Sequence, residues 1–141
     1  MSFNPYLFFS GDCADAFAFY SEVFGVEARV MTNADLPDDA EPMPGAEPSH
    51  VMHAAIELGG SFLMGSDDPS GSGGPKAGFC VSYSAPDVES VHRVVDALAA
   101  GGEISMPVIE TFWAPAFGML TDRFGVSWAI DTFPVEGDQP A

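Results

Sequence analysis

The chain has 141 residues, 47% of them hydrophobic, and carries 21 Asp and Glu against four Lys and Arg, for a net charge of −17. This length suits one domain or two small modules, and the charge makes nucleic acids and anionic membrane surfaces poor partners. No apolar run could span a bilayer and the N-terminus lacks a secretory signal pattern, so we expect a cytoplasmic protein. Cys13 and Cys80 fit neither a CxxC motif nor a disulfide framework, which predicts two reduced thiols.

The first half of the chain is expected to form a strand, a helix and three further strands. Residues 3–9 are a strongly apolar strand candidate, and a helix follows that Asp12 could cap and that Gly25 should end. Residues 26–31 are a short strand candidate. Residues 32–49 form an acidic, proline-rich insertion that should be a loop.

Two more strands, residues 50–58 and 61–66, flank Gly59-Gly60, the signal of a two-residue hairpin turn. This turn places Glu57 opposite Phe62 and Ala55 opposite Met64. Because side chains alternate along a strand, His53 shares that face, while the uniformly apolar face on the other side should meet the helix.

The order of elements then repeats after a segment rich in Gly, Ser and Pro. We expect a strand at 78–83, a helix capped by Asp87 and ended by Gly101-Gly102, and a strand at 103–109. A final hairpin follows. The sequence therefore predicts a first βαβββ module at 1–66, a linker at 67–77, a second βαβββ module at 78–133 and a disordered polar tail at 134–141.

The final hairpin turns at Asp122-Arg123-Phe124-Gly125, where an Asp can bond its own backbone and a Gly can take positive φ. If Thr121 faces Val126, one face should be a bulky core and the other the small, mixed wall of a pocket. The expected core residues are Phe117, Met119, Trp128 and Ile130, and the expected pocket residues are Gly118, Leu120, Ser127 and Ala129.

Two tandem βαβββ modules are the pattern of the vicinal-oxygen-chelate superfamily, which includes glyoxalase I, extradiol dioxygenases and bleomycin-resistance proteins. Local motifs across nearly the whole chain resemble its PhnB-like branch. They are Pro5-Tyr6-Leu7-Phe8-Phe9, Gly11, Ala16-Phe17-Ala18-Phe19-Tyr20, Phe24-Gly25, His53, Thr111-Phe112-Trp113 and Asp122-Arg123-Phe124-Gly125-Val126-Ser127-Trp128. The resemblance implies an α+β fold in which the modules form a curved, eight-stranded mixed sheet with helices outside and a cavity inside, usually in a homodimer.

Members of the superfamily that use a metal take one ligand from the first strand and one from the last strand of each module. By this resemblance the four places lie near Pro5, Met64, Phe79 and Ala129. None of these side chains suits a divalent cation such as zinc or magnesium, and a shift of one residue offers no ligand set either. We therefore expect no metal and no other cofactor.

His53 and Glu57 are the only obvious acid–base pair, because they lie four residues apart on one strand and share a face. The alternative is that His53 bonds a neighbouring group while Glu57 reaches solvent. Trp113, near the expected cavity edge, could bury a ligand, bury a dimer partner or fill the mouth of the barrel. The predicted inner surface comprises His53, Glu57, Phe62, Met64, Phe79, Leu120 and Ala129.

Three functions remain open on the sequence. The first is a metal-independent protein that binds a small, partly apolar organic molecule. The second is an enzyme, such as a lyase or isomerase, that uses His53 and Glu57. The third is a metal enzyme whose ligands the resemblance does not reveal.

Overall fold

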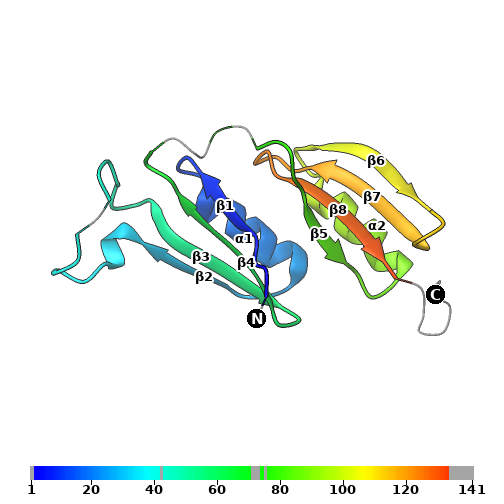
Figure 1. The fold of residues 1–141 in the computed structure, drawn as a ribbon, viewed down its shortest axis with the longest axis horizontal. Helices are drawn as coiled ribbons and strands as arrows, with labels where there is room; N and C mark the ends of the chain where they lie inside the picture. Colours follow the sequence, from blue (N-terminus) through cyan, green and yellow to red (C-terminus); the bar gives the residue numbers. More distant parts are fainter. Residues whose placement is uncertain (1, 42, 71–73, 75, 134–141) are drawn as a thin grey trace. The chain divides into compact units, whose positions relative to one another are not determined.

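In the computed structural model, which describes residues 2–41, 43–70, 74 and 76–133, the chain divides into two compact units, Met1–Pro75 and Lys76–Ala141. Each unit contains one α-helix packed on a four-stranded mixed sheet (Figure 1), so the predicted α+β fold of two tandem βαβββ modules is confirmed. The predicted limits of the modules and linker stay a prediction, and the tail at 134–141 lies outside the described residues. None of the described helices is long and apolar enough to cross a membrane.

The first module runs β1 (Tyr6–Phe9), α1 (Cys13–Phe24), β2 (Ala28–Thr32), the short 3-10 helix η1 (Asn33–Asp35), β3 (Val51–Leu58) and β4 (Ser61–Asp67). Its sheet has the order β1-β4-β3-β2, in which β1 is parallel to β4 and the other pairs are antiparallel. The hairpin register predicted from Gly59-Gly60 is confirmed, with Glu57 opposite Phe62 and Ala55 opposite Met64.

The face of this sheet that meets α1 is apolar and closely packed. Ala54, Ile56 and Leu63 are buried on it. Gly65 lies so near the helix that a Cβ placed there would be 2.8 Å from the Phe17 ring. Because side chains alternate, His53, Ala55, Glu57, Phe62 and Met64 lie on the opposite face, as predicted.

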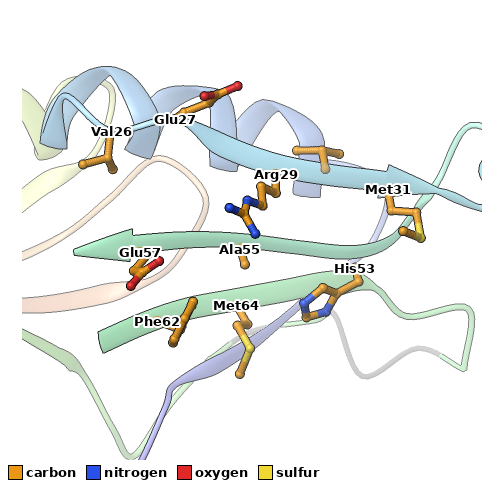
Figure 2. Close-up of a pocket in the computed structure, with 10 residues that line it drawn as sticks. Val26, Glu27, Arg29, Met31, His53, Ala55, Glu57, Phe62 and Met64 are labelled. Carbon is orange, nitrogen blue, oxygen red and sulfur yellow. The ribbon is translucent and has the colours of Figure 1, made fainter. Parts of the chain in front are cut away.

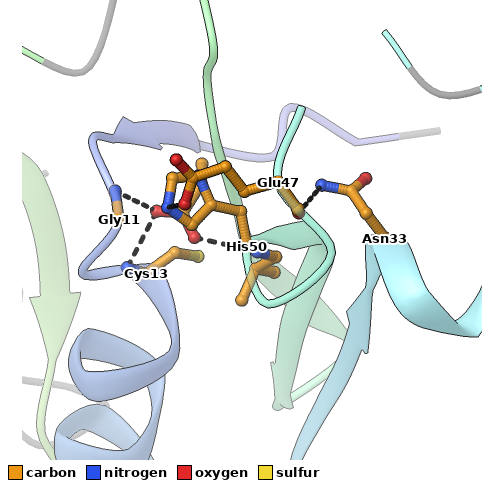
Figure 3. Close-up of polar contacts among 7 residues, drawn as sticks. Gly11, Cys13, Asn33, Glu47 and His50 are labelled. Carbon is orange, nitrogen blue, oxygen red and sulfur yellow. Dashed lines mark hydrogen bonds and ion pairs between the residues drawn. The ribbon is translucent and has the colours of Figure 1, made fainter. Parts of the chain in front are cut away.

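The cap of α1 differs from the prediction. Asp12 makes no side-chain hydrogen bond at the helix start. Instead Asp67, at the end of β4, accepts hydrogen bonds from the backbone N–H groups of Gly11 at 2.7 Å, Cys13 at 3.1 Å and Val51 at 2.8 Å (Figure 3). A residue 54 positions away thus caps the helix, which no local motif could reveal.

The second module repeats this order as β5 (Val81–Ser84), α2 (Val88–Leu98), β6 (Glu103–Ile109), β7 (Ala116–Thr121) and β8 (Ser127–Thr132). Its sheet order is β5-β8-β7-β6, with β5 parallel to β8. Asp87 caps α2 as predicted, because its carboxylate accepts from the N–H of Ser90 at 2.7 Å.

The register predicted for the final hairpin is wrong by one residue. Thr121 pairs with Ser127 rather than with Val126. The cause is Asp122, whose carboxylate accepts from the N–H groups of Phe124 and Val126 and draws Val126 into the turn. The shift places every side chain of β7 on the face opposite to the one predicted.

Leu120 is consequently not a pocket residue. It lies opposite Trp128, only 1% of its surface is exposed, and it belongs to the face against α2. Phe117 and Met119, which were predicted to be core residues, lie on the face turned away from α2. Ala129 lies on that face too, as predicted.

The predicted strand at 78–83 also begins later than expected. Gly78 has a φ of 84°, which is a turn conformation, so extended structure starts at Val81. Phe79 therefore precedes β5, is 52% exposed, and does not pair with β8. Ser82 is the residue beside Ala129.

Candidate functional site

A pocket of about 580 Å³ lies on the face of the first sheet that is turned away from α1 (Figure 2). This volume falls within the usual range for sites that bind small molecules. The lining side chains are mostly apolar, with a few charged groups among them. They are Val26, Glu27, Arg29, Val30, Met31, His53, Ala55, Glu57, Phe62 and Met64.

The floor of the pocket is Ala55, the smallest side chain in its row. Strand pairing places Arg29 beside it on β2 and Met64 beside it on β4. Along β3, Figure 2 shows His53 on one side of Ala55 and Glu57 on the other. A small residue between longer ones leaves a depression in the sheet surface, and this explains why the pocket lies here.

His53 lies next to Tyr6, a partner that the sequence did not reveal. The Tyr6 hydroxyl is 3.2 Å from His53 Nδ1, and the ring centroids are 5.7 Å apart. With Nδ1 engaged, Nε2 is the nitrogen left for a ligand or a proton transfer. Tyr6 comes near His53 because it pairs with Met64 across the parallel β1–β4 ladder, a register that no local sequence signal shows.

His53 and Glu57 lie on the same face of β3 and line the same pocket, whereas their role as an acid–base pair stays a prediction. Their positions on β3 are about 13 Å apart, at about 3.3 Å per residue. A direct hydrogen bond is therefore out of reach, and among the described residues none joins these two side chains. Only a ligand that spans the floor could contact both.

Arg29 is a charged pocket residue that sequence reasoning missed. The β2–β3 register sets the direction of its side chain, because Arg29 pairs with Ala55 and Met31 pairs with His53. Within the described part of the chain, no carboxylate oxygen lies within 4.0 Å of its guanidinium. The other basic side chains, Lys76, Arg93 and Arg123, all belong to the second compact unit.

The remaining predicted site residues lie in the second module. Ala129 faces away from α2, beside Ser82. Trp113 is 42% exposed and makes edge-to-face contacts with Phe112, at 4.8 Å between ring centroids, and Phe117, at 5.5 Å. The structure therefore brings together His53, Glu57, Phe62 and Met64, whereas the wider surface that includes the second module stays a prediction.

Residues at the metal positions of the resemblance do not form a ligand set. Met64 pairs with Tyr6, and Ala129 pairs with Ser82. Among the described residues, no group of three or more His, Cys, Asp or Glu side chains could hold a metal ion. The side chains of Tyr6, Met64, Ser82 and Ala129 do not make a ligand set for a divalent cation.

Comparison with known proteins matches residues 2–130 to the family model described as Glyoxalase/Bleomycin resistance protein/Dioxygenase superfamily. Protein YjdN of Escherichia coli (strain K12) is 37% identical over 139 residues, which cover 93% of this chain and 95% of YjdN.

Two solved structures extend the similarity. Protein PA1353 from Pseudomonas aeruginosa is 36% identical, with a TM-score of 0.82 over 94% of this chain and 98% of that one. The PhnB protein from Bacillus cereus is 25% identical, with a TM-score of 0.73 over 94% and 99%. The resemblance to the PhnB-like branch is thereby confirmed.

Proposed function

The chain belongs to the glyoxalase/bleomycin resistance protein/dioxygenase superfamily, and on that basis we propose that it binds a small, partly apolar organic molecule in the pocket of the first module without a divalent metal. The observation that carries the proposal is the pocket over Ala55, where Phe62 and Met64 supply apolar surface and a few polar groups could orient a ligand. Mostly apolar pockets with few polar groups are typical of small-molecule sites.

A thermal-shift screen of small organic molecules tests the proposal on the full chain. Phe62→Ala should weaken the binding of any hit, because the ligand loses apolar contact area. Phe133→Ala is the matched control, since it removes an exposed phenyl ring from the second module. Equal effects of the two substitutions would place the ligand elsewhere, and elemental analysis that finds about one zinc, nickel or iron per chain would overturn the metal-free part.

The contact between Tyr6 and His53 favours a second candidate, a metal-independent lyase or isomerase. Tyr6 would hold the imidazole ring so that Nε2 moves a proton on the bound molecule, and Glu57 would act at the other end of the same ligand. His53→Gln should then abolish turnover while ligand affinity is largely kept. If binding and turnover fall together, His53 is a binding residue and the enzyme candidate fails.

We also propose that the protein is a homodimer and that Trp113, which is partly exposed, contributes to the dimer contact or to ligand binding. Its neighbour Phe112 is 92% exposed, and large aromatic side chains are enriched at interfaces. Because each chain has a net charge of −17, two copies repel each other, and low salt should weaken the dimer. Light scattering at micromolar concentration in moderate salt tests this, and a monomer there would contradict it.

A further inference from the structure

We infer that the molecule bound in this pocket carries a single negative charge, as a carboxylate, and that Arg29 pairs with it. The inference rests on the proposed binding function and adds the chemical class of the ligand.

The position of Arg29 is the first step. It lies on the edge strand β2 directly beside Ala55, so its side chain stands at the wall of the pocket rather than at a distant surface (Figure 2). Throughout the described part of the chain, no carboxylate oxygen comes within 4.0 Å of the guanidinium. The donors of Arg29 are thus available to a ligand.

The charge of the chain makes this arrangement unusual. Acidic residues outnumber basic ones by 21 to four, so a basic side chain has many carboxylates with which it could pair. Arg29 instead lies beside Ala55 at the wall of the pocket. Its planar fork of N–H donors matches a carboxylate in two parallel hydrogen bonds, which makes the pair both strong and specific in orientation.

An acidic residue of the pocket limits the ligand to one charge. Glu27 and Glu57 line the same pocket as Arg29. A phosphate monoester, with close to two charges, would gain from Arg29 but would be repelled by Glu57, whereas the Glu27 carboxylate is turned away from the Ala55 floor (Figure 2). A carboxylate carries half that charge, so the balance of attraction and repulsion favours it.

The apolar residues define the rest of the ligand. From Arg29 the floor runs over Ala55 to Met64, with Phe62 beside it. A molecule with its carboxylate on Arg29 would therefore lay a flat or aliphatic body over Ala55 and against Met64 and Phe62. Aromatic and cyclic carboxylic acids have this shape.

Matched pairs of carboxylates and amides test the inference on the full chain, by NMR titration or calorimetry. Suitable pairs are benzoate with benzamide and 2-naphthoate with 2-naphthamide, with phenyl phosphate as the dianion, all at about pH 8 where histidine is neutral. The variants are Arg29→Gln and, as control for the same change in net charge, Arg93→Gln on the exposed face of α2.

We expect each carboxylate to bind the natural protein about five- to tenfold more tightly than its amide, as one charge-assisted contact would give. Arg29→Gln should remove that preference and leave the amide affinity unchanged, whereas Arg93→Gln should leave both intact. Phenyl phosphate should bind more weakly than benzoate. Amides that bind as tightly as carboxylates, with signal shifts at Phe62 and Met64, would overturn the charge inference and leave the binding function standing. If no member of the pairs shifts those signals, both proposals fall.

Discussion

The Tyr6 hydroxyl lies 3.2 Å from His53 Nδ1 and ties strand β1 to strand β3 across the intervening β4. Tyr6 is 39% exposed, so this contact borders solvent and adds little to stability. Its consequence is chemical, because it fixes the orientation of the only histidine that lines the described pocket.

Tyr6→Phe should therefore change the behaviour of His53 more than the stability of the fold. We expect the imidazole NMR signals to show a mixture of tautomers, while the free energy of unfolding falls by less than about 1 kcal/mol. Tyr83→Phe, the same change in the second module, is the control. If both variants leave the His53 signals unchanged, the contact does not orient the ring.

Gly65 is required where α1 approaches the sheet. A Cβ there would meet the Phe17 ring at 2.8 Å and the Leu7 carbonyl oxygen at 2.9 Å. Gly65→Ala should lower the free energy of unfolding by about 1–3 kcal/mol, as expected for overpacking in a core. Gly74→Ala, where nothing lies within 4 Å, is the matched control. Equal melting temperatures for the two variants would show that the helix moves away at little cost.

Local sequence signals predicted the first module well. Gly59-Gly60 fixes a two-residue turn, so the faces of His53, Glu57, Phe62 and Met64 followed from counting. The register predicted for the second hairpin was wrong for a physical reason. The turn length there depends on the hydrogen bonds of Asp122, which also accepts from Trp128 Nε1 at 2.9 Å, and a contact with a buried indole cannot be read from turn residues.

The site was predicted only as far as single strands allow. His53 and Glu57 could be placed on one face because they share a strand. Arg29 and Tyr6 could not, because their neighbours depend on how β2 and β1 align with the central hairpin. Those registers are set by tertiary packing, including a bulge between Met31 and Thr32.

The two cysteines should differ sharply in reactivity. Burial raises the pKa of Cys13 to about 12, and the nearby carboxylates of Asp67 and Asp12 add to the rise. Cys80 is exposed. Alkylation of the folded protein at mildly alkaline pH should therefore modify Cys80 alone, whereas denaturant should expose both thiols, as mass spectrometry of peptides would show. Rapid labelling of Cys13 in the folded state would contradict the burial.

The same pKa shift predicts how stability depends on alkaline pH. The pKa of Cys13 is higher in the folded than in the unfolded protein. The stability that the buried neutral thiol contributes is therefore fully present below the ordinary thiol pKa, and it is lost as pH rises toward the folded pKa. Above about pH 9 the free energy of unfolding should fall by roughly 1 kcal/mol per pH unit from this group. Cys13→Ala should show a shallower fall, measured by urea titration at several pH values, whereas Cys80→Ala should not.

Asp67 should be among the most costly positions to change. Only 6% of its surface is exposed, and its carboxylate accepts from three backbone N–H groups, those of Gly11, Cys13 and Val51 (Figure 3). Asp67→Ala would leave these donors without an acceptor at the start of both α1 and β3. Each unsatisfied buried donor costs about 1–3 kcal/mol, so we expect a loss of about 3 kcal/mol or more in the free energy of unfolding.

Two further variants separate this role from a change in charge. Asp67→Asn keeps one acceptor oxygen but turns an amide donor toward an N–H group, so its loss should be intermediate. Asp68→Ala removes the same charge from the next residue, whose side chain accepts from Ser70 near the surface, and should cost much less. Urea unfolding of the three variants measures the order, and a similar loss for Asp67→Ala and Asp68→Ala would show that α1 does not depend on this carboxylate.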